Sequence, residues 1–129
     1  MNKKMIKVGS VLMALSVILG AITAHVLEKH LTEKMLKTFE TAARYQTYHS
    51  LGIILCGILT MGFDLKKINW VYKLFLIGII LFSGSLYALS LLSLTGNESF
   101  KMLGAITPFG GLCFIIGWIY LAIILSKLK

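Results

Sequence analysis

The sequence predicts an all-α fold, a polytopic membrane four-helix bundle with a short amphipathic surface helix between its first two spans. The chain of 129 residues is 57% hydrophobic and only 14% charged, with a mean hydropathy of +0.86. A soluble domain of this length could not cover so much apolar surface. The apolar residues also gather into runs of about the length that crosses a bilayer. We therefore expect one integral membrane domain over residues 1–129, with spans at about 8–27, 42–63, 70–94 and 107–126.

The first apolar run follows a basic start, MNKKMIK, and covers residues 8–26. A secretory signal begins in a similar way. However, 19 apolar residues are long for a signal core and suit a span, so we expect a retained first helix. Ser16, Gly20 and Ala24 lie four residues apart on it and form a stripe of small residues against which another helix can pack closely.

The second span is the one around which the functional argument turns. Residues 28–37 alternate charged and apolar residues at helical spacing, which predicts the short surface helix. No proline or glycine interrupts residues 31–50, so we expect this helix to run into the second span with little break. The apolar run that follows, 50–63, has only 14 residues, whereas a span needs about 20. The spanning helix must therefore begin near Ala42 or Ala43. This start draws four polar residues below the membrane surface: Arg44, Gln46, Tyr48 and His49.

The two remaining spans have recognisable boundaries. Trp70 and Tyr72 begin the third span as interfacial anchors, and a loop at 95–101 contains the turn sequence TGNES. The fourth helix is predicted to begin at Thr107-Pro108, because threonine is a good N-cap and proline suits the first helical position. Residues 103–106 would then be a non-helical approach or a broken extra turn. Trp118 and Tyr120 would lie towards the far interface, and Gly110, Gly111 and Gly117 would permit close packing.

The charges predict an orientation. Four spans place both termini on one side, where eight lysines lie, against five lysine and arginine residues on the other side. The positive-inside rule then places both termini in the cytoplasm. The net charge of +8 comes from lysines at helix ends. We therefore expect contacts with membrane lipid headgroups and no nucleic-acid partner.

With this topology, polar residues gather at the outer ends of the helices. Glu40 and Arg44 share a helix face, so the arginine should pair with the glutamate or extend outward to the surface. His49 and Tyr87, each about seven residues from a predicted helix end, would lie roughly 10 Å deep and could meet. A second face of this helix carries Tyr45 and His49. A helix with polar residues on two faces should be central in the bundle or lie at an oligomer interface. The candidate site residues are Glu40, Arg44, Tyr45, Tyr48, His49, Ser83, Tyr87, Thr107 and His25.

Two interpretations of this cluster stay open. Polar side chains between membrane helices commonly serve packing, at about 0.6 kcal/mol each. Ionisable groups inside a membrane are, on the other hand, candidates for function, and an imidazole such as that of His49 can carry or sense a proton. The three histidines lack metal-site spacing, and Cys56 and Cys113 stand alone, so we expect no metal, cofactor or disulfide. No catalytic arrangement is recognisable, so we expect no enzyme.

Four segments resemble a known family. LGAITAH at 19–25, TFETAARYQTYHSLG at 38–52, LFSGSLYALSL at 81–91 and LGAITPFGGLCFIIGW at 103–118 are similar to the YgdD/YwdK-like family of small four-helix bacterial membrane proteins, which is a domain-of-unknown-function family. The resemblance covers nearly the whole chain. It implies a multi-pass protein of the bacterial plasma (inner) membrane and supplies no substrate.

Three functional hypotheses follow. The first is a small-solute or ion binding site, related to transport, in the outer half of the bundle; transport would require a homo-oligomer because the chain is small. The second is a non-enzymatic accessory subunit that docks a larger membrane partner through the stripes Ser16/Gly20/Ala24 and Gly110/Gly117. The third is a membrane enzyme that acts on lipid or quinone.

Overall fold

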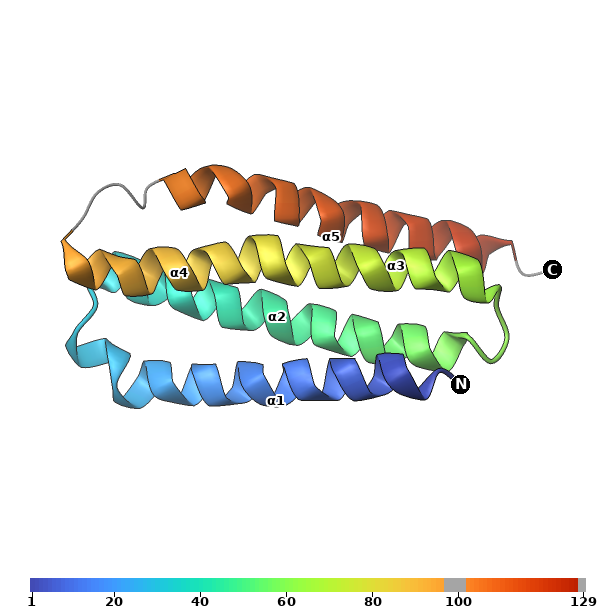
Figure 1. Ribbon diagram of the computed structural model, residues 1–129, viewed down its shortest axis with the longest axis horizontal. Helices are drawn as coiled ribbons and strands as arrows, with labels where there is room; N and C mark the ends of the chain where they lie inside the picture. The colour runs from blue at the N-terminus through green and yellow to red at the C-terminus, as the bar shows by residue number, and fades with distance from the viewer. Residues whose placement is uncertain (97–101, 128–129) are drawn as a thin grey trace.

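Four long helices run the length of the molecule in a computed structural model that describes residues 1–96 and 102–127 (Figure 1). Both chain ends lie at the same end of the molecule (Figure 1). Among the described residues the regular structure is entirely helical, which confirms the all-α prediction. The elements are α1 (Lys3–His25), η1 (Leu27–Lys29), α2 (Glu33–Leu59), α3 (Leu65–Gly78), η2 (Ile79–Ser83), α4 (Gly84–Leu92), η3 (Ser93–Thr95) and α5 (Leu103–Ser126).

Three of these helices are long and apolar enough to cross a membrane. They cover Lys3–Lys29, Leu65–Thr95 and Leu103–Ser126. The fourth, α2, has 27 residues and is therefore longer than α1 and α5, but its polar first half lowers its mean hydropathy. Helix α2 nevertheless lies alongside the other three helices (Figure 1).

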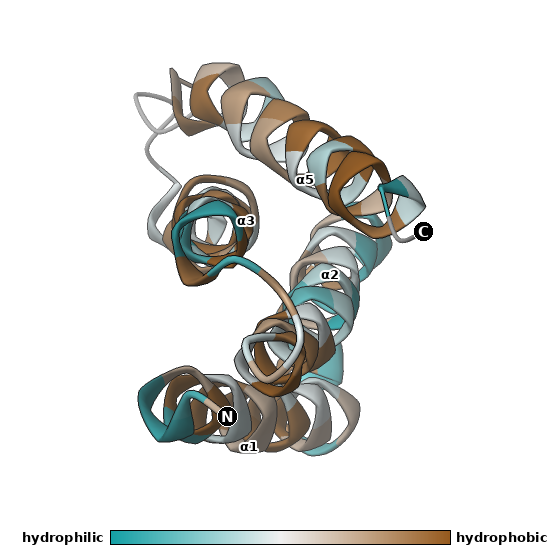
Figure 2. Cartoon of the chain, turned by 90° about the vertical axis from the view of Figure 1, so that its right-hand side faces the viewer, coloured by the Kyte–Doolittle hydropathy of each residue, from teal (hydrophilic) through white to brown (hydrophobic). Residues whose placement is uncertain are grey.

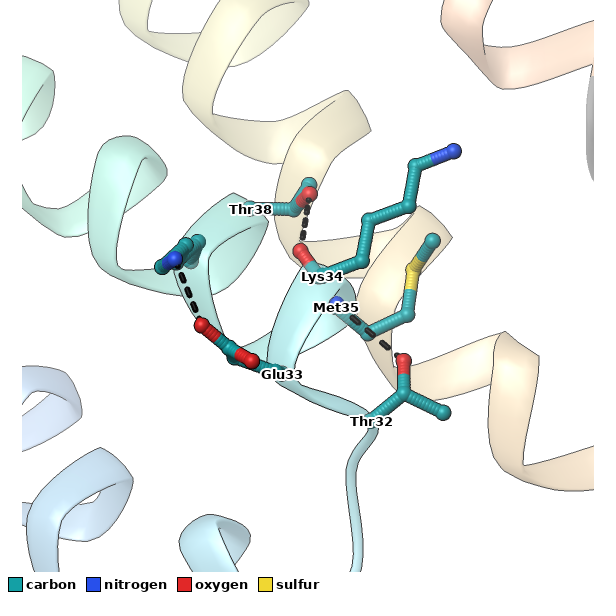
Figure 3. Close-up of polar contacts among 6 residues, drawn as sticks. Thr32, Glu33, Lys34, Met35 and Thr38 are labelled. Atoms are coloured by element: carbon teal, nitrogen blue, oxygen red, sulfur yellow. Dashed lines mark hydrogen bonds and ion pairs between the residues drawn. The ribbon is translucent and has the colours of Figure 1, made fainter.

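Helix α2 begins earlier than the sequence suggests. Thr32 is its N-cap, and the Thr32 hydroxyl accepts a hydrogen bond from the Met35 N–H at 3.3 Å (Figure 3). In the first turn, Lys37 Nζ lies 2.7 Å from Glu33 Oε1, and the Thr38 hydroxyl donates to the Lys34 carbonyl. Of the segment predicted as a surface helix, residues 33–37 are thus the start of α2, and only Glu28 and Lys29 belong to η1.

The predicted start of the last helix is wrong. Helix α5 begins at Leu103, and Pro108 lies inside it. Proline removes the bond that its own N–H would give to the Gly104 carbonyl, so the second turn of α5 lacks one intrahelical bond. Thr107 is not an N-cap; its hydroxyl lies 2.7 Å from the Ser85 hydroxyl. Apart from Thr95 and Gly96, the predicted loop at 95–101 lies outside the described residues.

Helix α2 is central, as expected, because it packs against α1, α3, η2 and α4. Helix α1 packs chiefly on α2, and α5 packs chiefly on α3, η2 and α4. Viewed along the helices, α1 and α5 therefore lie on opposite sides of the molecule (Figure 2).

Glycines decide where the helices approach closely. A Cβ at Gly9 would lie 2.8 Å from the Ser50 carbonyl oxygen of α2, and a Cβ at Gly110 would lie within 2.8 Å of backbone atoms of Leu81 and Phe82. The predicted stripe on α1 is therefore only partly right. Its buried small residues are Gly9, Ser16 and Thr23, at a spacing of seven, whereas Gly20 and Ala24 are exposed.

Elements α3, η2 and α4 follow one another without a gap and form the third long helix, which contains a π-helical segment. In η2 the Gly84 N–H bonds to the Ile79 carbonyl, five residues back. Gly110 of α5 packs against this segment. The apolar core lies mainly towards the end with the termini, around Ile53, Ile68 and Phe75, and a smaller cluster around Phe39 closes the other end.

Candidate functional site

The predicted site residues do not form one site. His25, Glu40, Arg44, Tyr45 and Tyr48 are exposed on helix surfaces. The other four are less accessible: His49 and Ser83 are buried, and Tyr87 and Thr107 are half-buried.

Arg44 does not pair with Glu40. In residues 1–96 and 102–127 the one ion pair joins Lys37 to Glu33. Arg44 is exposed, which agrees with the alternative that its side chain extends outward. His25 ends α1 and belongs to neither of the groups described below.

The first group, which we call the amide cluster, consists of Leu12, Phe39, Gln46 and Tyr87. Gln46 is 4% exposed; its Nε2 donates to the Leu12 carbonyl at 2.8 Å, and its Oε1 accepts from the Tyr87 hydroxyl at 2.8 Å. The Tyr87 ring packs on Phe39 at 4.7 Å between centroids. One side chain of α2 thus connects α1 to α4.

Hydroxyl groups form further links between helices. Ser83 donates to the Ala42 carbonyl at 2.8 Å, Thr47 donates to the Ser16 hydroxyl at 3.0 Å, and Ser85 and Thr107 are 2.7 Å apart. Every buried side-chain N or O atom in the described part of the chain has a hydrogen-bond partner. This arrangement supports the packing interpretation for Ser83, Tyr87 and Thr107.

His49 belongs to a second group and has a different environment. Its Nδ1 lies 2.7 Å from the Tyr45 carbonyl oxygen, and Trp118 Nε1 donates to its Nε2 at 3.1 Å. Its ring stacks on Phe114 with 3.4 Å between centroids and 9° between planes. Because a carbonyl only accepts and an indole N–H only donates, these bonds fit a neutral imidazole with its proton on Nδ1.

His49 and Tyr87 lie in separate groups, contrary to the expectation that they could meet. The expectation placed both about seven residues from a helix end. Because α2 begins at Glu33, His49 is in fact 16 residues into the helix and nearer its other end. Trp118, which the sequence predicts only to lie towards the far interface, donates a hydrogen bond to His49.

Beside His49, an open groove of about 520 Å³ lies between α2 and α5. We call it the aromatic groove. It opens sideways, since Tyr48 is 52% and Ile115 58% exposed. The rings of Tyr45 and His49 are 17° from parallel, and those of Tyr45 and Phe114 are 26° from parallel. The groove is lined by Tyr45, Tyr48, His49, Phe82, Gly111, Phe114, Ile115 and Trp118.

Sequence reasoning missed Gln46, Phe114 and Trp118 as members of these groups. A primary amide within an apolar span requires partners, and this signal could have identified Gln46. Phe114 and Trp118 are four residues apart on α5, a spacing that places both rings on one face. Nothing in the sequence, however, indicates that this face meets His49.

The structure shows no metal centre in the parts of the chain that it describes. No three histidine, cysteine, aspartate or glutamate side chains there come together in a metal-binding group. Cys56 is buried and Cys113 half-buried, and both are free thiols.

Comparison with known proteins finds a family of unknown function and bacterial relatives that are named membrane proteins. Residues 19–111 match the model of a family described as "Protein of unknown function (DUF423)". A UPF0382 membrane protein of Staphylococcus haemolyticus is 42% identical over 121 residues, which are 94% of this chain and 93% of the relative. The UPF0382 membrane protein YwdK of Bacillus subtilis is 37% identical over 126 residues, 97% of this chain and 98% of the relative. No solved structure matches.

Proposed function

Because the chain belongs to the DUF423 family of proteins of unknown function, whose relatives in bacteria are named membrane proteins, we propose that it binds a small lipid-soluble solute in the plasma membrane. We further propose that it does so as a multi-pass protein with cytoplasmic termini. The observation that carries the proposal is the aromatic groove between α2 and α5.

The groove suits a small molecule with a planar ring. Its volume of about 520 Å³ falls within the usual range for small-molecule sites. Most of its lining is aromatic, and several of the rings lie nearly parallel, so that a flat ligand could stack against them. The polar side chains within it are those of Tyr45, Tyr48 and His49, with the indole N–H of Trp118. Because the groove opens sideways, the solute would enter from among the lipid chains.

We propose binding without catalysis. Both nitrogens of His49 are engaged, one with the Tyr45 carbonyl and the other with the Trp118 indole. A general base needs a free nitrogen within hydrogen-bond reach of the substrate proton. His49 in this arrangement is better suited to shaping the groove than to accepting a proton from a ligand.

Protonation of His49 would alter the groove. Protonation would add a proton to Nε2, which now accepts from Trp118. Two N–H donors would then point at each other, and the hydrogen bond would break. Solute binding would then respond to pH through His49. Transport across the membrane would require several copies, because the groove of one copy opens sideways and does not lead from one surface to the other.

Fluorescence of Trp118 tests solute binding. In a Trp70→Phe background, Trp118 is the single tryptophan, and 2-methyl-1,4-naphthoquinone serves as a flat, lipid-soluble quenching probe. We expect the quinone to quench the Trp118 fluorescence in a saturable way. Gly111→Leu should abolish saturation, because a Cβ there makes only ordinary contact with the Phe82 ring at 3.6 Å and a larger side chain would fill the groove. Gly104→Leu is the matched control on the same helix, where nothing lies within 4 Å.

The outcome separates binding from partition into lipid. Saturable quenching in the Trp70→Phe parent and in its Gly104→Leu variant, but not in its Gly111→Leu variant, would support the proposal. Linear, equal quenching in all three proteins would show that the probe merely dissolves in the bilayer, and the proposed function would be abandoned.

A second candidate role is docking through α1, to another copy or to a membrane partner. Gly110 and Gly117 are not free for docking, because they pack on Phe82 and Phe75 of the same chain, and Ser16 contacts Thr47. On α1, however, Gly20 has nothing within 4 Å and neighbouring Ala24 is exposed. The docking hypothesis therefore applies only to the face of α1 that carries Gly20 and Ala24.

Oxidative crosslinking tests the docking role. With both native cysteines replaced by alanine, Gly20→Cys should form disulfide dimers in native membranes or crosslink to a partner. Val11→Cys, exposed on the far side of α1, should not. Equal crosslinking at the two positions would indicate random collision and remove the docking role.

A further inference from the structure

A pocket with charged residues in its lining lies at the end of the molecule that holds the start of α1, between the α2–α3 turn and the last turns of α5. Its volume is about 250 Å³. Two lysines from different parts of the chain contribute to its lining, Lys67 from α3 and Lys127 directly after α5. The other lining residues are Gly62, Phe63, Asp64, Tyr120, Ile123 and Ile124.

An apolar groove of about 450 Å³ continues from this pocket along α3 and α5. Tyr120 and Ile123 line both the pocket and the groove, so the two are adjacent. Trp70, which is 59% exposed, forms one wall of the groove. The remaining lining residues are Leu74, Ile116 and Ile119.

The charges at the polar end favour an anion. The pocket contains two lysines and one carboxylate, and the carboxylate of Asp64 already accepts the Lys66 N–H at 2.8 Å as the N-cap of α3. A further cation lies beside the groove, because Lys73 Nζ is 4.9 Å from the centre of the Trp70 ring. Basic residues at the membrane surface attract anionic headgroups.

We propose that the pocket and groove together bind one anionic phospholipid. The headgroup phosphate would lie between Lys67 and Lys127, and an acyl chain would follow the wall formed by Trp70, Leu74 and Ile119. An amphiphile is the class of ligand that needs a basic pocket joined to an apolar groove. The site is formed by α3 and α5 at the other end of the molecule from Arg44, and the inference does not depend on solute binding in the aromatic groove.

Lipid-specific quenching of Trp70 tests the inference. In a Trp118→Phe background, Trp70 is the single tryptophan. The protein is reconstituted in phosphatidylcholine vesicles that contain a small, fixed fraction of lipid brominated in its acyl chains, either phosphatidylglycerol or phosphatidylcholine. We expect phosphatidylglycerol to be favoured at Trp70 by about fivefold or more, the preference typical of a single lysine near the surface. Brominated lipid in both leaflets makes the result independent of protein orientation.

Neutral variants identify the residues responsible. In the double variant Lys67→Gln/Lys127→Gln, the preference for phosphatidylglycerol should fall to about one. Lys4 is an exposed lysine in the first turn of α1, at the same end of the molecule, and Lys4→Gln should leave the preference unchanged. All three side chains are exposed, so we expect every variant to fold. Equal quenching by the two lipids in the unsubstituted lysine background would overturn the inference. A preference that survives in the double variant would overturn it as well.

Discussion

The amide cluster and the aromatic groove are both centred on side chains of α2 that lie three residues apart, yet their surroundings differ. Gln46 faces α1 and α4 and forms hydrogen bonds to both. His49 faces α5 and borders a groove that is open to the side. A polar residue in a membrane helix thus serves packing where neighbouring helices close around it, and can line a binding surface where they stand apart.

The helices stand apart at His49 because α5 is held elsewhere. Gly110 and Gly117 bring α5 close to the third helix, against Phe82 and Phe75 respectively. Aromatic side chains then fill only part of the space between α5 and α2. The groove is therefore a consequence of where the glycines of α5 lie, and this relation can be tested by changing them.

The largest effect is expected from Gly110→Ala, which should push α5 away from η2. The new Cβ would lie 2.8 Å from the Leu81 carbonyl carbon and closer still to the Phe82 nitrogen, and backbone atoms cannot move aside easily. We expect a loss of about 3 kcal/mol in the free energy of unfolding, measured by dodecyl sulfate titration in mixed micelles. Gly111→Ala is the adjacent control and should lose almost nothing. Equal stability of the two variants would contradict this account of the groove.

The next largest effect is expected from Gln46→Leu, which removes both bonds of the amide cluster. The Tyr87 hydroxyl would lose its acceptor and the Leu12 carbonyl, which stays bonded within α1, would lose its second donor, at about 2 kcal/mol together. Tyr87→Phe removes only one bond and should lose less. In the double variant the two losses should not add, because the substitutions share one bond. Full additivity in the same titration would show that the Gln46–Tyr87 bond contributes nothing.

A smaller effect on stability is expected from Trp118→Phe, which keeps a ring but removes the bond to His49 Nε2. The loss should be about 0.6 kcal/mol, the average for a hydrogen bond between membrane helices. With Trp118 present and Trp70 replaced by phenylalanine, acidification should shift the Trp118 emission once His49 takes up a proton, because the bond to Nε2 is then broken. His49→Phe should remove the shift. A shift that persists in His49→Phe would assign it to another group.

The smallest effect is expected from the Glu40/Arg44 pair. Both side chains are exposed and they form no ion pair, so Glu40→Gln and Arg44→Gln should each change the free energy of unfolding little. Their coupling in a double-mutant cycle should be about zero. A coupling comparable to that of a buried pair would show that the two side chains meet in the membrane.

The sequence was sufficient for the general architecture. Long apolar runs predict the all-α fold, and the short apolar run at 50–63 correctly indicates that α2 carries its polar residues into the bundle and is central. These features depend on composition and periodicity, which a single sequence contains. The positions of the individual contacts depend on helix boundaries and on the rotation of each helix, and these are decided by tertiary packing.

Particular residues show where the prediction failed. The charged segment at 28–37 reads as a surface helix that continues into the second span, and the continuity is correct, but Glu33–Lys37 are the first residues of α2 itself. Pro108 reads as a helix start, although the helix tolerates it in its second turn. Trp118 reads only as a residue towards the far interface, and nothing local indicates its hydrogen bond to His49, which lies 69 residues earlier in the chain. Local signals do not contain such long-range pairings.

The π-helical turn at Ile79–Ser83 has a consequence for the length of the chain. A π turn accommodates one residue more than an α turn. Removal of a single residue there would let the helix return to regular winding, with Ser85 still opposite Thr107 and Tyr87 still opposite Gln46. The same deletion in the regular helix of α3 would instead rotate everything beyond it by about 100°. A one-residue deletion within Ile79–Ser83 should therefore damage the protein less than one within α3, because the wide turn already holds a spare residue.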